Sequence, residues 1–196
     1  MATERRLKRI REVIYRRQPD LTLVLENIHD SHNVSAILRT CDAVGIDHVS
    51  LLYTIEAFPK IGKKSSASAS KWVTRDRYTS VDSCFAALRA KGFAIYTTHI
   101  NDDSKSLYEY DFTRPVALVF GNEHRGVSEE AVRAADGNVV IPQVGMMQSL
   151  NVSVSCAVVL YEAFRQRSLV GAYEGTKFDA EELERRIAET VKKGTK

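Results

Sequence analysis

Three polar segments of the chain hold most of the side chains that could do chemistry. They are HDSHNVSAILRTCDAVG (residues 29–45), FGNEHRGVSEE (120–130) and IPQVGMMQSLNVSVS (141–155). Each follows an expected strand or opens an expected helix, which is where an α/β sheet carries its binding loops. The free backbone N–H groups at a helix start favour a polar or anionic ligand there.

The spacing of side chains within these segments suggests what each could contribute. Asn33 and Arg39 are six residues apart at the start of an expected helix, which places them on roughly neighbouring faces. Glu123 lies in a glycine-flanked loop, and Ser149 and Asn151 open a long apolar helix.

Several familiar sites are absent from the sequence. It has no G-x-G-x-x-G, no H-E-x-x-H and no G-x-S-x-G. Gly121 and Gly126 have the spacing of a phosphate-binding loop, but Val127 occupies the position of its lysine. The histidines and the three cysteines show no metal-ligand spacing, so we expect no metal site and no disulfide, with each cysteine buried.

Apolar strand-like runs alternate with helical patterns along most of the chain. The expected strands are 21–27, 48–53, 93–98, 116–120 and 138–142. Expected helices cover 33–44, stopped by Gly45, then 80–91, a segment capped by Ser128, and 151–169. Continuous apolar strands indicate a buried parallel sheet with helices on both faces, so the fold class is α/β.

The two ends of the chain differ from this middle. Residues 1–20 form a basic amphipathic helix with Leu7, Ile10, Val13 and Ile14 along one seam, ended by Pro19. Residues 174–196 form a polar tail, in which Asp179 and Glu182 resemble a capping box that opens a last helix. This tail could pack on the body, on a second protomer or on nothing.

The charge of the chain favours a polyanionic partner. The net charge is +3, but basic residues cluster in 5–17, in a Ser-rich stretch with Lys60, Lys63, Lys64 and Lys71, and at 165–167. Clusters of this kind suit nucleic acid. No apolar run is long enough to cross a bilayer and no signal peptide is apparent, so a cytoplasmic protein is expected.

The three polar segments closely resemble the motifs of the SpoU/TrmH family of RNA 2'-O-methyltransferases, within the SPOUT class. The matches are N-x-x-A-I-L-R-T at 33–40, F-G-x-E-x-x-G at 120–126 and I-P-x-x-G-M-x-Q-S-L-N-V-S at 141–153. The flanks RRQPDLT and YEAFRQR resemble members that methylate a D-loop guanosine of tRNA, at position 18, rather than ribosomal RNA. The resemblance spans roughly residues 9–173.

The resemblance implies a fold and an assembly that the residue pattern does not. Residues 21–173 would form a SPOUT methyltransferase domain, with a deep trefoil knot at about 116–169. Family members use S-adenosyl-L-methionine and work as homodimers with the active site near the subunit interface. No metal or membrane is implied.

Roles for individual residues follow from the same resemblance, each with a simpler alternative. Arg39 would be the main catalytic residue, against an ion pair with Asp42 or Glu26. Asn33 would orient Arg39 or the ribose, against a helix N-cap. Glu123 would support the active-site loop, against a solvated acid. Ser149 and Asn151 would contact substrate or cofactor, against competing caps of the last core helix.

The remaining implied residues bind cofactor or RNA. The cofactor would be held by Thr98, Gly121, Ile141, Met146 and Leu150. The RNA would be contacted by Arg9, Arg11, Lys91, Arg165 and Arg167. Two other functions stay open: a 2'-O-methyltransferase of ribosomal RNA, and a non-catalytic RNA-binding module. Retention of Arg39 and of the S-L-N triplet at 149–151 favours an enzyme.

Overall fold

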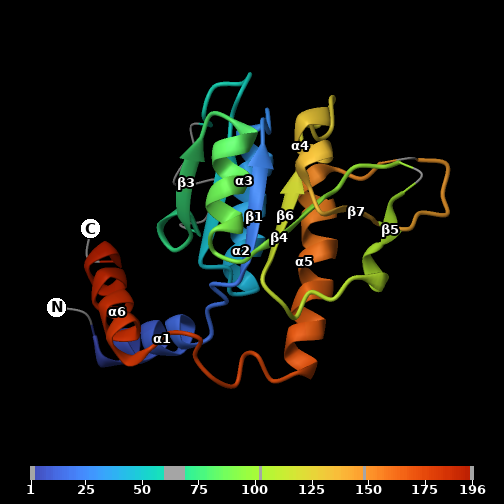
Figure 1. Cartoon of the computed structure of the whole chain (residues 1–196). Coiled ribbons are helices and arrows are strands. Elements are labelled where there is room, and N and C mark those ends of the chain that lie inside the picture. The colour runs from blue at the N-terminus through green and yellow to red at the C-terminus, as the bar shows by residue number, and fades with distance from the viewer. Residues whose placement is uncertain (1–2, 60–68, 102, 148, 195–196) are drawn as a thin grey trace.

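The structure is a computed structural model that describes residues 3–59, 69–101, 103–147 and 149–194 (Figure 1). Within these residues seven strands form one sheet in the order β3-β2-β1-β6-β4-β7-β5, and every neighbouring pair is parallel. The strands are β1 (Leu21–Glu26), β2 (His48–Leu52), β3 (Thr74–Tyr78), β4 (Ala94–Thr97), β5 (Lys105–Ser106), β6 (Val116–Phe120) and β7 (Gly137–Val140). The expected α/β class with a parallel sheet is confirmed.

The central strands are buried on both faces, which explains their continuous apolar sequences. Along β1, Leu23 and Leu25 pack into one core while Val24 packs into another on the opposite face. This alternation follows from the two-residue period of a strand. The first core also receives α2 (Ser31–Ala43) and α5 (Val152–Leu169), and the second receives α3 (Val81–Arg89) and part of α4 (Glu129–Ala134).

Several helix ends were correctly predicted from single residues. Ser80 and Ser128 cap α3 and α4 through hydrogen bonds from the third residue of each helix. Gly45 follows α2 with a φ of +85°, a backbone conformation that glycine adopts without strain. Helix α2 begins two residues earlier than expected, because Asp30 rather than Asn33 is its N-cap.

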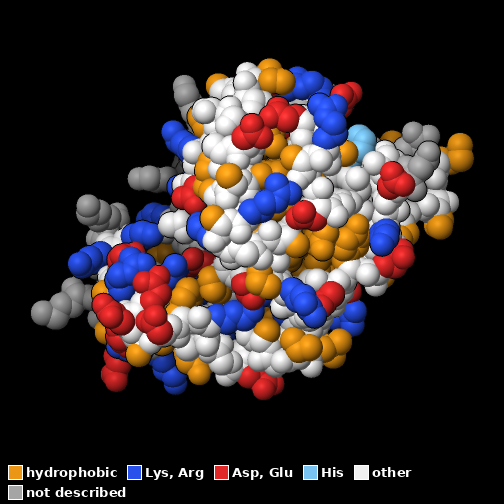
Figure 2. Space-filling view, viewed as in Figure 1, with side chains coloured by type: hydrophobic (Ala, Val, Ile, Leu, Met, Phe, Trp, Pro, Cys, Tyr) orange, Lys and Arg blue, Asp and Glu red, His pale blue; other side chains and the backbone are white. Residues whose placement is uncertain are grey.

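The two terminal helices pack on each other. Helix α1 (Glu4–Tyr15) and helix α6 (Ala180–Gly194) lie side by side below the sheet, where Figure 2 shows side chains of both charges gathered. Ile10, Ile14 and Ile187 form a small core between them. Arg11 pairs with Glu184 at 2.8 Å, so the tail packs on the body of the same chain. Asp179 accepts from the Glu182 N–H, as one half of the expected capping box.

Strands β3 and β5 were not expected from the sequence. Strand β3 reads TRDRY and is largely exposed at the sheet edge, so it lacks the apolar run that marks the inner strands. Strand β5 has two residues, and two short 3-10 turns at Ala69–Lys71 (η1) and Leu107–Glu109 (η2) complete the elements. The basic positions Lys60, Lys63 and Lys64 lie outside the described residues.

Candidate functional site

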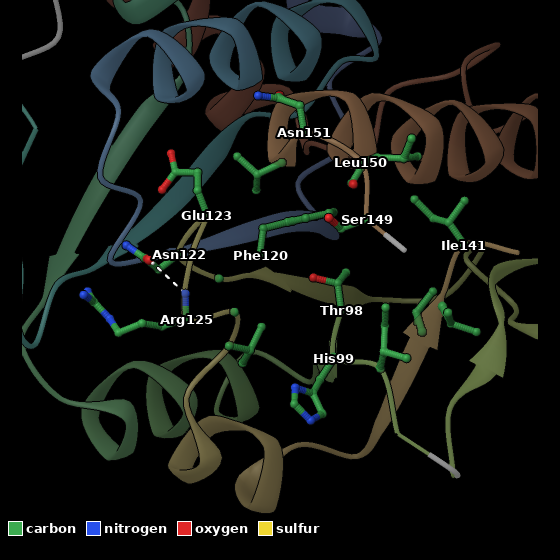
Figure 3. A pocket seen from close by; sticks show the side chains of 18 of the residues that line it. Thr98, His99, Phe120, Asn122, Glu123, Arg125, Ile141, Ser149, Leu150 and Asn151 are labelled. Carbon is green, nitrogen blue, oxygen red and sulfur yellow. Dashed lines mark hydrogen bonds between the residues drawn. The ribbon is translucent and has the colours of Figure 1, made fainter. Parts of the chain in front are cut away.

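A cavity of about 570 Å³ opens beyond the carboxyl ends of β4, β6 and β7 and beside the start of α5. Figure 3 shows side chains from these elements around it. Parallel strands place their carboxyl ends on one edge of the sheet, where α/β proteins bind ligands. The cavity wall is formed by Thr98, His99, Ile100, Phe120, Gly121, Asn122, Glu123, His124, Arg125, Gly126, Val127, Val139, Val140, Ile141, Gln143, Ser149, Leu150, Asn151, Val152 and Ser155.

The cavity gathers most of the residues assigned to the cofactor. Thr98, Gly121, Ile141 and Leu150 all line it. The Thr98 hydroxyl donates to the Val119 carbonyl at 2.9 Å, so this side chain holds two strands together beside the cavity. Met146 is not on the cavity wall, and this residue is 98% exposed.

A chain of hydrogen bonds joins the three polar segments at the mouth of the cavity. Asn33 donates through Nδ2 to Glu123 Oε1 at 2.9 Å, and Asn151 donates through Nδ2 to Asn33 Oδ1 at 3.2 Å. Glu123 also accepts from the backbone N–H groups of His29 and Asp30. The Glu123 carboxylate is therefore the anchor of the loop that enters α2, rather than a solvated acid.

The alternatives for the two asparagines have different outcomes. Asn33 is not an N-cap, because Asp30 accepts from the His32 N–H and fills that role. Asn151 is the N-cap of α5, with Oδ1 accepting from the Ser153 N–H at 2.9 Å. Its amide nitrogen still faces Asn33, so one side chain both caps the helix and joins the polar chain. Ser149 is exposed on the cavity wall.

The loop from Gly121 to Gly126 folds back on itself beside Glu123. Asn122 and Gly126 form an isolated antiparallel bridge, and Gly126 has a φ of +69°. A Cβ at Gly121 would lie 2.2 Å from the Gly126 carbonyl carbon, so only glycine fits there. The glycine spacing that resembles a phosphate-binding loop therefore serves a tight backbone turn.

Two residues that hold the loops at the carboxyl ends of β1 and β6 were not identified from the sequence. Asn27 has a φ of +50°, and its Oδ1 accepts from the N–H groups of Thr54, Ile55 and Glu56. Asn122 donates through Nδ2 to the Asn27 carbonyl at 2.7 Å, which ties the end of β1 to the glycine loop. A polar residue one or two positions after a buried strand was the available signal at Asn27 and Asn122.

Glu56 connects two parts of the site on the outer side. Its carboxylate accepts from Arg125 Nη2 at 2.7 Å, and its other oxygen is 3.4 Å from His29 Nδ1. The hydrogen bond from Arg125, and then that from His29, lowers the pKa of Glu56. Glu56 therefore holds the glycine loop next to the entry of α2.

Arg39 lies apart from the cavity wall within one chain. It is on the exposed face of α2, about 9 Å along the helix axis from Asn33. The proposed pairing with Asp42 or Glu26 is wrong, because Asp42 pairs with Arg17 and buried Glu26 accepts from the Ser128 N–H. Among the described residues the Arg39 guanidinium forms no ion pair.

The basic residues assigned to RNA differ in how exposed they are and in whether an acid already pairs with them. Lys91 is exposed. Arg9, Arg11 and Arg165 are also exposed, but each pairs with an acid: Glu12, Glu184 and the buried Glu162, respectively. Arg167 is fully buried, so the expectation that it contacts RNA is wrong. Its guanidinium pairs with Asp20 at 2.6 Å and donates to three backbone carbonyls, which makes it a structural link between α5 and β1. A buried charge is retained when it is paired in this way.

Replacing Glu123 by Gln will lower the free energy of unfolding at neutral pH, with a smaller effect in acid. Burial alone would raise the pKa of Glu123. The hydrogen bonds from Asn33 and from the His29 and Asp30 N–H groups outweigh burial, so the pKa of Glu123 is lowered. A lowered folded-state pKa gives stability above the unfolded value of about 4.3, and this stability is lost as the pH falls through the folded pKa. We expect the difference in free energy of unfolding between the two proteins to shrink below about pH 4 in urea titrations.

A matched control for this variant is Glu129→Gln, since Glu129 is an exposed acid on α4 that pairs with Arg133. It should change stability by less than about 0.5 kcal/mol at neutral pH. A Glu123→Gln protein with unchanged stability across this pH range would contradict the anchoring role.

Comparison with known proteins agrees with this geometry. The sequence matches the SpoU rRNA Methylase family over residues 20–161, and the chain belongs to that family. It is 45% identical over 191 residues to the tRNA (guanosine(18)-2'-O)-methyltransferase of Thermus thermophilus, covering 97% of this chain and 98% of the relative.

Solved structures show the same fold. The crystal structure of the A. aeolicus TrmH/SpoU tRNA modifying enzyme superposes with a TM-score of 0.92 at 38% identity, over 98% of both chains. The SpoU methyltransferase AviRb from Streptomyces viridochromogenes, solved in complex with the cofactor AdoMet, has a TM-score of 0.68 at 28% identity. That match covers 78% of this chain and 62% of AviRb. No helix in the described part of the chain could span a membrane.

Proposed function

We propose that this protein transfers a methyl group from S-adenosylmethionine to the ribose 2'-hydroxyl of guanosine-18 in the tRNA D-loop. The observation that carries the proposal is the hydrogen-bonded chain Glu123–Asn33–Asn151, which brings one residue from each motif to one cavity mouth. The similarity to tRNA (guanosine(18)-2'-O)-methyltransferases over nearly the whole chain supports the choice of substrate. A tRNA substrate also favours a cytoplasmic location.

The cavity suits the proposed cofactor. Its volume of about 570 Å³ is in the range of cofactor pockets, and Val139, Ile141 and Leu150 give it an apolar wall that could hold an adenine ring. Polar groups of Thr98 and Ser149 lie on the same wall. When bound, S-adenosylmethionine supplies an electrophilic methyl group on a positively charged sulfur.

The protein's own residues would position the ribose and stabilise the charge that forms on it. A 2'-hydroxyl is a weak nucleophile, so its oxygen must be held in line with the methyl group while its proton leaves through water. Arg39 would grip a substrate phosphate and stabilise the developing alkoxide, since a guanidinium is effectively never deprotonated and forks onto phosphate oxygens. Asn33 and Asn151 would orient the ribose from the polar chain.

We also propose that two copies assemble through α5. This helix is apolar around most of its surface, yet Val154 and Tyr161 are about half exposed. A helix that is apolar all round is normally covered. Ser155 and Asn151 on the same helix line the cavity, so a second copy on this face would close the cavity mouth. Arg39 is on α2, which packs against α5, and would lie beside the same interface.

Replacing Tyr161 by Asp will shift the protein from dimer to monomer, because a charge would be buried in an apolar interface. Sedimentation velocity measures the change, and methylation activity should fall with it. Tyr15→Asp is the control, since Tyr15 is also an exposed tyrosine but lies on α1, which packs against α6. A Tyr161→Asp protein that sediments like wild type would exclude this face as the interface.

The region from residue 116 to 169 would form the trefoil knot implied by the family. In support of this, β6 pairs with both β1 and β4, while β7 pairs on the far side of β4. After β7 the chain continues to α5, which joins the core shared with α2. This strand order is compatible with a chain that passes through its own loop.

A second function of the same class is methylation of ribosomal RNA, favoured by the description of the matched family. Methylation of separately purified tRNA and ribosomal RNA distinguishes the two. Incorporation into tRNA alone supports the proposal, incorporation into ribosomal RNA alone replaces it, and incorporation into neither favours a binding module.

A further inference from the structure

The edge strand β3 carries two arginines that neither the motifs nor the cavity uses. Arg75 and Arg77 are two residues apart, so both side chains emerge from the same face of the sheet, about 6.6 Å apart along the strand. Tyr78, of opposite parity, packs on the α3 side of the sheet. The arginine pair therefore lies on the other face, which α2 covers nearer the sheet centre.

Arg77 is held in place by an aromatic ring. Its guanidinium carbon lies 4.9 Å from the centroid of Phe58, and Phe58 packs against Tyr53 with ring centroids 5.2 Å apart. Tyr53 is anchored in turn by its hydroxyl, which donates to the Ile28 carbonyl at 2.9 Å. An arginine restrained in this way loses little side-chain freedom when it binds a ligand.

The two positive charges have no compensating acid among the described residues. Glu56 is engaged by Arg125 and His29, and Asp76 emerges on the opposite face of β3. Partial burial, and then the charge of Arg77, lowers the pKa of Arg75. Like charges held together destabilise a strand, so this arrangement suits an anionic partner that would offset the repulsion.

The position of the pair relative to the cavity fits one extended ligand. Strand β3 is three strands from β6, about 14 Å across the sheet. The strands are parallel, so Arg77 lies toward the carboxyl-terminal end of the sheet, which is also the end that carries the cavity. Lys71, at the end of η1, adds another positive charge just before β3.

We propose that Arg75 and Arg77 bind the sugar–phosphate backbone of the RNA substrate outside the methylation cavity. This inference rests on the proposed function for the identity of the RNA. It assigns the pair a role in substrate affinity and none in the chemical step. The rival explanation is that charged residues protect a sheet edge from pairing with other chains.

The test compares the double variant Arg75→Gln/Arg77→Gln with wild type for tRNA binding and methylation. We expect the KM and Kd for tRNA to rise about tenfold, with kcat within about twofold. The slope of log affinity against log salt should fall by about 1.4, or 0.7 for each lost phosphate contact. Thermal stability should be unchanged or higher, because a like-charge contact is removed.

Two further variants separate RNA binding from edge protection. Arg75→Glu/Arg77→Glu keeps a charged edge but should weaken tRNA binding more than the Gln pair. Arg114→Gln is the matched control, because Arg114 is an exposed arginine just before the central strand β6, at the end of the sheet opposite the cavity.

The possible outcomes are distinct. Equal tRNA affinity and salt slope for wild type and both double variants would overturn the inference, as would aggregation of the Gln variant with unchanged affinity of the Glu variant. Direct tRNA binding is measured by fluorescence anisotropy, so a wild-type protein that binds tRNA without methylating it would count against the proposed function alone.

Discussion

Replacing Arg39 by Ala will lower kcat for tRNA methylation by about 10² to 10³-fold, while the affinity for S-adenosylmethionine stays within about twofold. Cofactor affinity should be nearly unchanged because Arg39 lies outside the cavity wall. The guanidinium is on the exposed face of α2 and has no ion-pair partner among the described residues, so it is available to a substrate phosphate. A guanidinium placed there can act on the RNA but does not help to form the cofactor cavity. Single-turnover methylation and calorimetric titration of the cofactor measure the two quantities.

Arg39→Lys tests which property of the side chain is needed. Lysine keeps the charge but loses the planar fork that binds two phosphate oxygens together, so we expect it to recover little of the lost rate. Arg133→Lys, an exposed arginine on α4, is the control and should behave like wild type. Near-normal turnover of Arg39→Lys would exclude a need for the fork.

Replacing Gly121 by Ala will strongly weaken cofactor binding. The new Cβ would lie 2.2 Å from the backbone of Gly126 and Val127, so the glycine loop must move away from the position that lines the cavity. Backbone atoms cannot yield as the end of a flexible side chain can. We expect the Kd for S-adenosylmethionine to rise by about 10²-fold or more, equal to about 2.7 kcal/mol.

Gly126→Ala is the matched control for this effect. Gly126 has a φ of +69°, but no atom lies within 4 Å of the position of its Cβ. The substitution should therefore cost about 1–2 kcal/mol of unfolding free energy from backbone strain and leave more cofactor affinity than Gly121→Ala. Equal losses in the two variants would show that loop conformation, rather than the contact at Gly121, controls the cavity.

The buried part of the fold was predictable from sequence because burial leaves a continuous apolar pattern. Strand β6 is apolar at all five positions and β1 at four of six, and each is covered on both faces. Strand β3 is an exposed edge with the sequence TRDRY, so the pattern gives no signal there. The pairing of α6 with α1 was one of several possibilities, since an amphipathic helix indicates an apolar face but not its partner.

The site was predictable where a motif carried it and was missed where backbone geometry did. The motifs led to Asn33, Glu123 and Asn151, which the structure brings together through hydrogen bonds. The role of Asn27 was not predicted, because it depends on a positive φ and on three backbone N–H donors from a loop distant in sequence.

Arg167 shows the opposite error. Arg165 and Arg167, two positions apart in a basic stretch, were both assigned to RNA. Arg165 is exposed, but Arg167 is fully buried. Positions two apart on a helix point in directions about 200° apart, so adjacent charges in the sequence need not share a surface. The deciding partner, Asp20, is 147 residues away in the chain.

The most direct test of the central claim is incubation of the wild-type chain with radiolabelled S-adenosylmethionine and unmodified tRNA, followed by mapping of the labelled nucleotide. The account predicts label on the ribose 2'-oxygen of guanosine-18, and labelling about 10²- to 10³-fold slower when Arg39→Ala replaces the wild-type protein. Label on a base, or on a ribose outside the D-loop, would contradict it.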